Sequence, residues 1–179
     1  MSSIEINTNG NKNTIRKIIS KPQLYRALTR VGMLLEYKTK ENIVRKGLVD
    51  HGYLLNSIKY TVDLNDTGGT VTIGSYGVKY AAIHEFGGDI YPRRARALTI
   101  PVAPWAKYHR ARDFDLVRIG SILVDPKKAK GKIPIPKDAI GFRLAKKVTM
   151  PERSYMRAAI DQSLPRIIRI LSSETGANT

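Results

Sequence analysis

Hydrophobic residues recur every three or four positions in two long segments of the chain. In the first segment, the repeating positions are Leu24, Leu28, Val31, Leu35 and Ile43. This spacing places the side chains on one face of a helix, so it predicts an amphipathic helix from Pro22 to just before Gly47. Ser20 is a suitable N-cap for this helix, and a proline suits its first turn.

The second helical pattern lies near the C-terminus, after Pro151. Its apolar positions are Met156, Ile160, Leu164, Ile167, Ile168 and Leu171. Pro165 falls inside this pattern and has no N–H to donate, so we expect a kink or a break near Ser163.

Between the two helical segments the hydrophobic period changes to two. Alternating residues over 58–64 and 71–73 predict two strands, and the run Asn-Asp-Thr-Gly-Gly at 65–69 predicts the turn of a β-hairpin. A third short strand is expected over 98–102. Pro101 and Pro104 confine that strand to a sheet edge or a short length.

These elements predict an α+β fold, with a small antiparallel β-sheet packed against a long N-terminal helix and a C-terminal helix. Residues 1–20 are polar and form a flexible N-terminal arm, while residues 21–179 form a single domain. A basic insertion of about 104–147 lies inside the domain, and its apolar runs 119–124 and 140–144 are expected to pair as an extra hairpin.

The composition narrows the possible classes of protein. The 179 residues are 42% hydrophobic and 26% charged, which is typical of a globular chain with a packed core. There is no cysteine, so disulfides and thiolate zinc sites are impossible. No apolar run is long enough to span a membrane and the N-terminus lacks a signal-peptide core, so we expect a soluble, intracellular protein without a membrane partner.

The charge is unusual, because 31 Lys+Arg face 15 Asp+Glu, which gives a net charge of +16. The stretch 90–153 holds most of the excess, with 16 basic and 5 acidic residues. Three interpretations remain open: a solvated loop, contact with phosphates, or contact with an acidic protein. The candidate partner-binding residues are Arg93, Arg94, Arg96, Lys127, Lys128, Lys130 and Lys132.

His84 and Glu85 are the most suggestive pair for chemistry, but the pattern around them does not complete a catalytic motif. A zincin would need a second histidine where Gly88 stands, and His51 and His109 have no ligands at metal spacing. General acid–base catalysis by Glu85 would require a second carboxylate, and the sequence does not identify one. Nucleophile elbows and phosphate-binding glycine loops are absent, so we expect neither catalytic residues, nor a metal, nor a cofactor.

The same stretch has a structural interpretation. Tyr80, Ile83 and Phe86 are three residues apart, so a short helix would bury them on one apolar face with His84 and Glu85 pointing elsewhere. Truncating Phe86 is then expected to cost about 3 kcal/mol. Gly87 or Gly88 ends such a helix, because glycine adopts the left-handed conformation easily.

Four blocks of sequence resemble the virion-morphogenesis, or tail-completion, family of tailed bacteriophages. They are GYLLNSIKY at 52–60, VTIGSYGVKYAAIHEFGG at 71–88, ALTIPVAP at 97–104 and KKVTMPERSYM at 146–156, and the resemblance runs from about residue 22 to residue 171. The residues that match the family's motifs are Tyr80, Ile83, His84, Phe86, Gly87, Gly88, Pro151, Arg153, Tyr155 and Met156. Tyrosine and methionine stand at the last two positions, where phenylalanine and leucine are usual, and Glu152 replaces a small residue.

This resemblance implies a structural virion protein without catalytic activity. Such a subunit forms or joins a ring of its own copies, expected to be sixfold, at the head-proximal end of the tail. The resemblance implies contacts with the tail tube, the head–tail connector and possible sheath proteins, with DNA passing through the lumen. It places the protein in the virion neck, and in the host cytoplasm during assembly.

Two alternatives from other classes remain open at this stage. The charge favours a basic nucleic-acid-binding module, although no helix-turn-helix, zinc finger or aromatic-bearing strand supports it. The third hypothesis is a hydrolase that uses Glu85.

Overall fold

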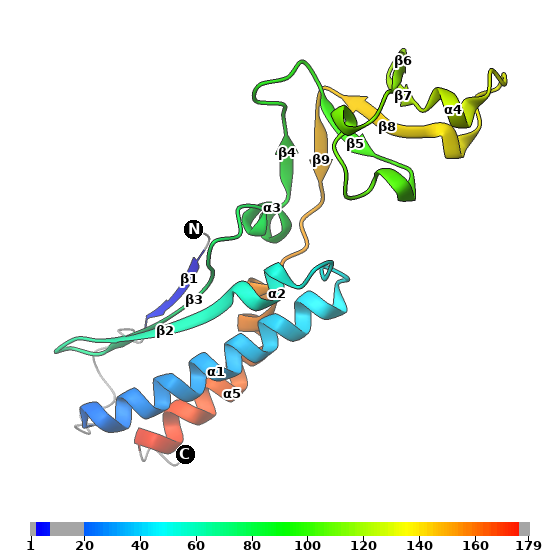
Figure 1. Cartoon of the computed structure of the whole chain (residues 1–179). Coiled ribbons are helices and arrows are strands. Elements are labelled where there is room, and N and C mark those ends of the chain that lie inside the picture. The colour runs from blue at the N-terminus through cyan, green and yellow to red at the C-terminus, as the bar shows by residue number, and fades with distance from the viewer. Residues whose placement is uncertain (1–2, 8–19, 176–179) are drawn as a thin grey trace. The chain divides into compact units, whose positions relative to one another are not determined.

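The computed structural model describes residues 3–7 and 20–175, and the chain divides into two compact units (Figure 1). Unit 1 comprises Met1–Gly87 and Pro151–Thr179, and unit 2 comprises Gly88–Met150. The fold is α+β, with a long N-terminal helix, small antiparallel sheets and a C-terminal helix, as the sequence predicts. Unit 2 contains the expected insertion, 104–147, but begins earlier, at Gly88.

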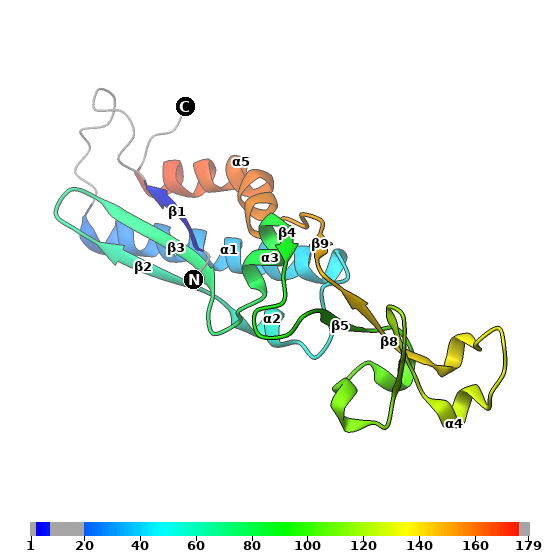
Figure 2. The same cartoon turned by 90° about the horizontal axis from the view of Figure 1, so that it is seen from above.

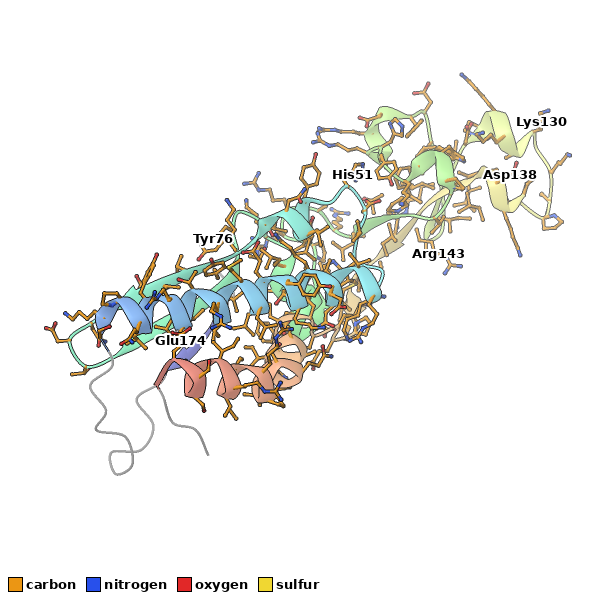
Figure 3. All side chains as sticks on the ribbon, turned by 90° about the horizontal axis from the view of Figure 1, so that it is seen from below. His51, Tyr76, Lys130, Asp138, Arg143 and Glu174 are labelled. Atoms are coloured by element: carbon orange, nitrogen blue, oxygen red, sulfur yellow. The ribbon has the colours of Figure 1, made fainter. Side chains whose placement is uncertain are left out.

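Two long helices dominate unit 1, and they run side by side on one face of its sheet (Figures 1 and 2). The helices of this unit are α1 (Lys21–Arg45), α2 (Tyr53–Ser57), α3 (Ala81–Phe86) and α5 (Met156–Thr175). The predicted N-cap of α1 is confirmed, since the Ser20 amide donates to Gln23 Oε1 at 3.1 Å in a capping box. Arg30 on α1 pairs with Glu174 on α5, Nη1 to Oε1 at 2.8 Å (Figure 3).

We predicted a kink or a break near Ser163, and the break does not occur, because helix α5 continues through Pro165. Proline removes one backbone hydrogen bond from the helix and crowds the preceding turn. Ile167 and Ile170 lie beyond the proline and are buried in the core of unit 1, while Pro165 itself is exposed. Tertiary packing of the distal turns therefore outweighs the local preference for a break.

The sheet of unit 1 has the strand order β1-β3-β2, and both pairings are antiparallel. Its strands are β1 (Ser3–Asn7), β2 (Ile58–Leu64) and β3 (Gly69–Ser75). The predicted hairpin is confirmed in β2 and β3, with Thr61 opposite Thr72. Within the expected N-terminal arm, residues 3–7 form β1 against β3, and residues 8–19 lie outside the described part of the chain.

The core of unit 1 lies between the sheet and the two long helices. Its largest buried side chains include Leu28, Leu35, Ile43, Ile58, Ile73, Tyr155 and Met156. Gly32 makes this packing possible, because a Cβ at that position of α1 would overlap the ring of Tyr60 on β2. The glycine is thus required for the close approach of helix and sheet.

Unit 2 contains two small antiparallel sheets. Strands β4 (Gly88–Ile90) and β9 (Val148–Met150) form the first, and the second has the order β5-β8-β7-β6. The strands of the second sheet are β5 (Leu98–Pro101), β6 (Val117–Ile119), β7 (Ile122–Val124) and β8 (Ile140–Ala145). The prediction that the prolines keep β5 at an edge is confirmed, and so is the pairing of the two apolar runs, as β7 with β8.

A compact aromatic cluster packs the second sheet of unit 2. Phe142 is fully buried between Ala103 and Ala106, with Trp105 and Phe114 against it. The short helices of this unit are α4 (Pro126–Ala129) and 3-10 turns at Pro104–Ala106, Ala111–Asp113 and Lys137–Ala139.

Candidate functional site

Glu85 is fully buried in unit 1, and its carboxylate accepts four hydrogen bonds from residues 154–157 at the start of α5. Oε2 accepts from the backbone amides of Tyr155 at 2.7 Å and Met156 at 2.9 Å. Oε1 accepts from the Arg157 amide at 2.9 Å and from Ser154 Oγ at 2.8 Å. The first amides of a helix have no partner inside the helix and favour a negative charge, so Glu85 caps α5 from a distant part of the sequence.

The segment that precedes α5 is joined to α3 by further bonds around Tyr155. The Arg153 amide donates to the His84 carbonyl at 2.9 Å, and the Tyr155 hydroxyl donates to the Ala81 carbonyl at 3.2 Å. From α1, the Asn42 side-chain amide donates to the Tyr155 carbonyl at 3.1 Å. Burial, and next the nearby charge of Glu85, raise the pKa of Tyr155 well above its usual range. Three helices therefore meet at one neutral, fully buried tyrosine.

The buried face of α3 differs from the predicted one. We expected Tyr80, Ile83 and Phe86 to face the core, but Tyr80 is 44% exposed and Phe86 is 47% exposed. Ala81 and Glu85, four residues apart, form the buried face instead. The prediction was wrong because the amides of α5 bind the Glu85 carboxylate, and this sets the rotation of a six-residue helix. The Phe86 ring lies 5.8 Å from the guanidinium of Arg157 at the surface.

His84 is partly buried, and no group of three potential metal ligands occurs among the described residues. Its ring meets the Tyr80 ring edge-on at 5.7 Å, and its Nδ1 has no hydrogen-bond partner. Burial, followed by the charge of Arg153, lowers the pKa of His84. Both effects favour the neutral imidazole, which packs against Tyr80.

Of the two glycines predicted to end α3, Gly87 is the one that does so. Gly87 is the C-cap of the helix, with φ of 67° and ψ of −166°. Gly88 also has a positive φ, 128°, and starts β4. Gly88 pairs with Met150, the residue before Pro151. The motif residues at 80–88 and 151–156 therefore flank the points where the chain enters and leaves unit 2.

The seven candidate partner-binding residues are all exposed in unit 2, but they form two separate groups. The arginine group at 93–96 precedes β5, whose Leu98 is opposite Ala145 at the end of β8. The lysine group at 127–132 lies on α4 and the turn after it, before β8 begins at Ile140 (Figures 1 and 3). Lys128 Nζ is 5.5 Å from the centre of the Trp105 ring. The sequence does not reveal that β8 separates the two groups.

Two surface grooves were not predicted. In unit 2, an open groove of about 450 Å³ is lined by Thr99, Arg110, Ala111 and Arg112. Two guanidinium groups and a hydroxyl suit an anionic partner. In unit 1, a groove of about 430 Å³ is lined by Tyr37, Lys40, Glu41, Val44, Arg45 and Leu55. The sequence signal for the second groove is Tyr37 and Val44, which lie off the buried stripe of α1 and are 63% and 58% exposed.

Comparisons with family models, curated proteins and solved structures found no match for this chain. No helix in the described residues is long and apolar enough to cross a membrane.

Proposed function

We propose that this chain is a structural subunit of the neck of a tailed bacteriophage. In this proposal it forms or joins a ring, with six copies, at the head-proximal end of the tail. It completes the tail, contacts the tail tube and any sheath, and binds the head–tail connector without catalysing a reaction.

The observation that carries the proposal is the set of bonds to Glu85. The sequence offered His84-Glu85 as its best candidate for chemistry, and all four bonds to this carboxylate come from the start of α5. These bonds join the two motif blocks that resemble the tail-completion family, 80–88 and 151–156, and this use of Glu85 is structural rather than catalytic. A general base would need a lone pair directed at a substrate, whereas both Glu85 oxygens point at buried helix amides.

Exposed apolar side chains on unit 1 support self-association. The groove beside Tyr37 and Val44 lies on α1, and Leu164 and Ile168 are 46% and 62% exposed on α5. A ring requires two different surfaces on each copy, one for each neighbour. Unit 1 therefore carries the kind of surfaces that a heterologous contact uses.

Unit 2 supplies the charge for contacts with other neck proteins. Its 63 residues include 15 Lys+Arg and 5 Asp+Glu, a net charge of +10. Two of its acidic groups already have internal partners: Asp89 pairs with Lys147 at 2.9 Å, and Asp125 accepts from the Lys127 amide at 2.9 Å. We assign the exposed cations to acidic protein neighbours, because a lumen dense with cations would retain DNA through its phosphates during ejection.

The test is head-to-tail joining with the four lysines of the α4 group replaced together. Lys127→Ser, Lys128→Ser, Lys130→Ser and Lys132→Ser are expected to lower joining in a phage assembly reaction and to weaken its salt dependence, because fewer charge contacts remain to be screened. A matched variant with arginine at the same four positions keeps the charge and should join normally. Normal joining by the serine variant, with an altered rate of DNA packaging or ejection, would place the lysines in the lumen.

A basic nucleic-acid-binding module is the second candidate, and the groove of Thr99, Arg110 and Arg112 favours it. Light scattering after size exclusion separates the two functions. A neck subunit is expected to form rings at high concentration or on tail tubes, with weak duplex binding. A monomer or dimer that binds duplex DNA tightly, with a steep salt dependence, would support the second candidate instead.

A further inference from the structure

The two edges of the β1-β3-β2 sheet are connected to the rest of unit 1 in different ways. Strand β2 is joined to β3 by the short turn 65–68, closed by the Asn65 amide donating to the Gly68 carbonyl at 3.0 Å. Strand β1 is joined to α1 through residues 8–20, a connection of 13 residues. A tight turn fixes β2 to its own β3, whereas a long connection imposes no such restriction on β1.

We propose that β1 is exchanged between copies of this chain, so that residues 3–7 of one copy pair with β3 of its neighbour. The connection 8–20 can span at most about 45 Å, roughly the width of a small domain, so it is long enough to reach an adjacent subunit. This proposal deepens the proposed ring, because it names the contact that joins successive copies.

The ladder that β1 forms with β3 supports the exchange. It runs from Ser3 opposite Gly74 to Asn7 opposite Thr70, and it places Ile4 and Ile6 opposite Ile73 and Val71. Val71 and Ile73 are 1% and 0% exposed, so this edge belongs to the core of unit 1. Among the described residues, β3 is the one element that β1 contacts extensively. A neighbour's β1 can make the same ladder, so exchange preserves every backbone hydrogen bond.

Exchange is also compatible with closure of a ring. When each copy donates its strand to one neighbour and accepts a strand from another, the contact is heterologous and can close into a ring, whereas mutual exchange between two copies gives a dimer. Strand addition at a sheet edge gives affinity through main-chain bonds, and the tethered strand reaches its acceptor at a high effective concentration once other surfaces touch.

Disulfide trapping tests the exchange cleanly, because the chain has no cysteine of its own. Glu5 is opposite Thr72 in the β1–β3 ladder, so a chain carrying both Glu5→Cys and Thr72→Cys has its two thiols at disulfide distance whichever copy supplies β1. After oxidation of the assembled protein, exchange gives a ladder of covalently joined copies on a denaturing gel. Pairing within each copy gives a monomer band that runs faster than the reduced chain.

A matched control uses the same acceptor position. Thr61 is also opposite Thr72, but on β2, so Thr61→Cys with Thr72→Cys must give a bond within each copy. A second test mixes a Glu5→Cys chain with a Thr72→Cys chain, and only exchange joins the two. The Thr61→Cys chain mixed with the Thr72→Cys chain should not become linked.

The outcomes separate this inference from the proposed function. Rings by light scattering together with a covalent ladder support both. Rings whose cysteines bond only within each copy overturn the exchange and leave the neck assignment standing. A covalent dimer without rings supports exchange and contradicts the ring, and monomers with internal bonds overturn both.

Discussion

Units 1 and 2 are stabilised and charged in different ways. The core of unit 1 contains fourteen buried hydrophobic residues within the described part of the chain, whereas the cluster in unit 2 contains three, Ala103, Ala106 and Phe142. Unit 1 has 16 basic and 10 acidic residues in 116, and unit 2 has 15 and 5 in 63. A small unit buries a smaller share of its surface, so its stability margin is narrow.

This difference predicts which property a substitution in each unit should change. In unit 1, most apolar side chains are committed to packing between helices and sheet. In unit 2, most charged side chains are exposed and have no packing role. We therefore expect stability to depend on unit 1 and recognition by charge to depend on unit 2.

The largest expected effect follows from removing the cap of α5. Glu85→Ala leaves the buried Tyr155 and Met156 amides without acceptors, which should lower the free energy of unfolding by about 3–5 kcal/mol. Urea unfolding followed by far-UV circular dichroism measures this loss. Glu85→Gln keeps one acceptor oxygen and should lose clearly less, and equal losses in both variants would contradict capping as the role of the carboxylate.

Two glycine substitutions are expected to cause smaller losses of stability, each confined to one unit. Gly32→Ala would drive a methyl group into the Tyr60 ring in unit 1, and Gly141→Ala would do the same to Trp105 in unit 2. Each overpacking should cost about 1–3 kcal/mol. Trp105 is the only tryptophan, so its fluorescence follows unit 2, while circular dichroism mostly follows the long helices of unit 1.

If either glycine variant shifts the unfolding transitions seen by fluorescence and by circular dichroism equally, the two units unfold together. That result would contradict the separate stabilities proposed for units 1 and 2. Tyr60→Leu combined with Gly32→Ala serves as the control. The shorter side chain makes room for the methyl group, so part of the lost stability should return.

The smallest effect is expected at Phe86, which the sequence had suggested as a core position. Its ring is 47% exposed and lies against Arg157, so Phe86→Ala should cost less than about 1 kcal/mol. Leu35→Ala, at a fully buried position of α1, is the reference and should cost about 2–5 kcal/mol. A Phe86→Ala loss as large as that of Leu35→Ala in the isolated chain would restore the core assignment.

Long periodic elements could be predicted from the sequence because many positions repeat the same signal. The stripe on α1 spans several turns, and the alternation in β2 and β3 flanks a clear glycine turn, so both were predicted correctly. Helix α3 has only six residues, and three apolar positions in it are too few to define a face. Its rotation depends on Glu85 meeting amides 70 to 72 residues later, which no local pattern reveals.

Tertiary packing also explains the other differences. Pro165 indicates a break when judged locally, but Ile167 and Ile170 are buried in the core and the helix continues. The start of unit 2 at Gly88 depends on the pairing of β4 with β9, two three-residue strands too short to be found by periodicity. The groove between Thr99 and the two arginines brings together residues of β5 and a 3-10 turn, so it could not be found from neighbouring positions alone.

The pairing of Gly88 with Met150 brings the first and last residues of unit 2 together. Partners in an antiparallel ladder are about 5 Å apart, so the chain leaves unit 1 and returns to it at nearly the same point. Residues can be gained or lost between these positions without changing the gap that Gly87 and Pro151 must bridge. Unit 2, with its net charge of +10, can thus vary in length without changing the hydrogen bonds by which Glu85 joins α3 to α5 in unit 1.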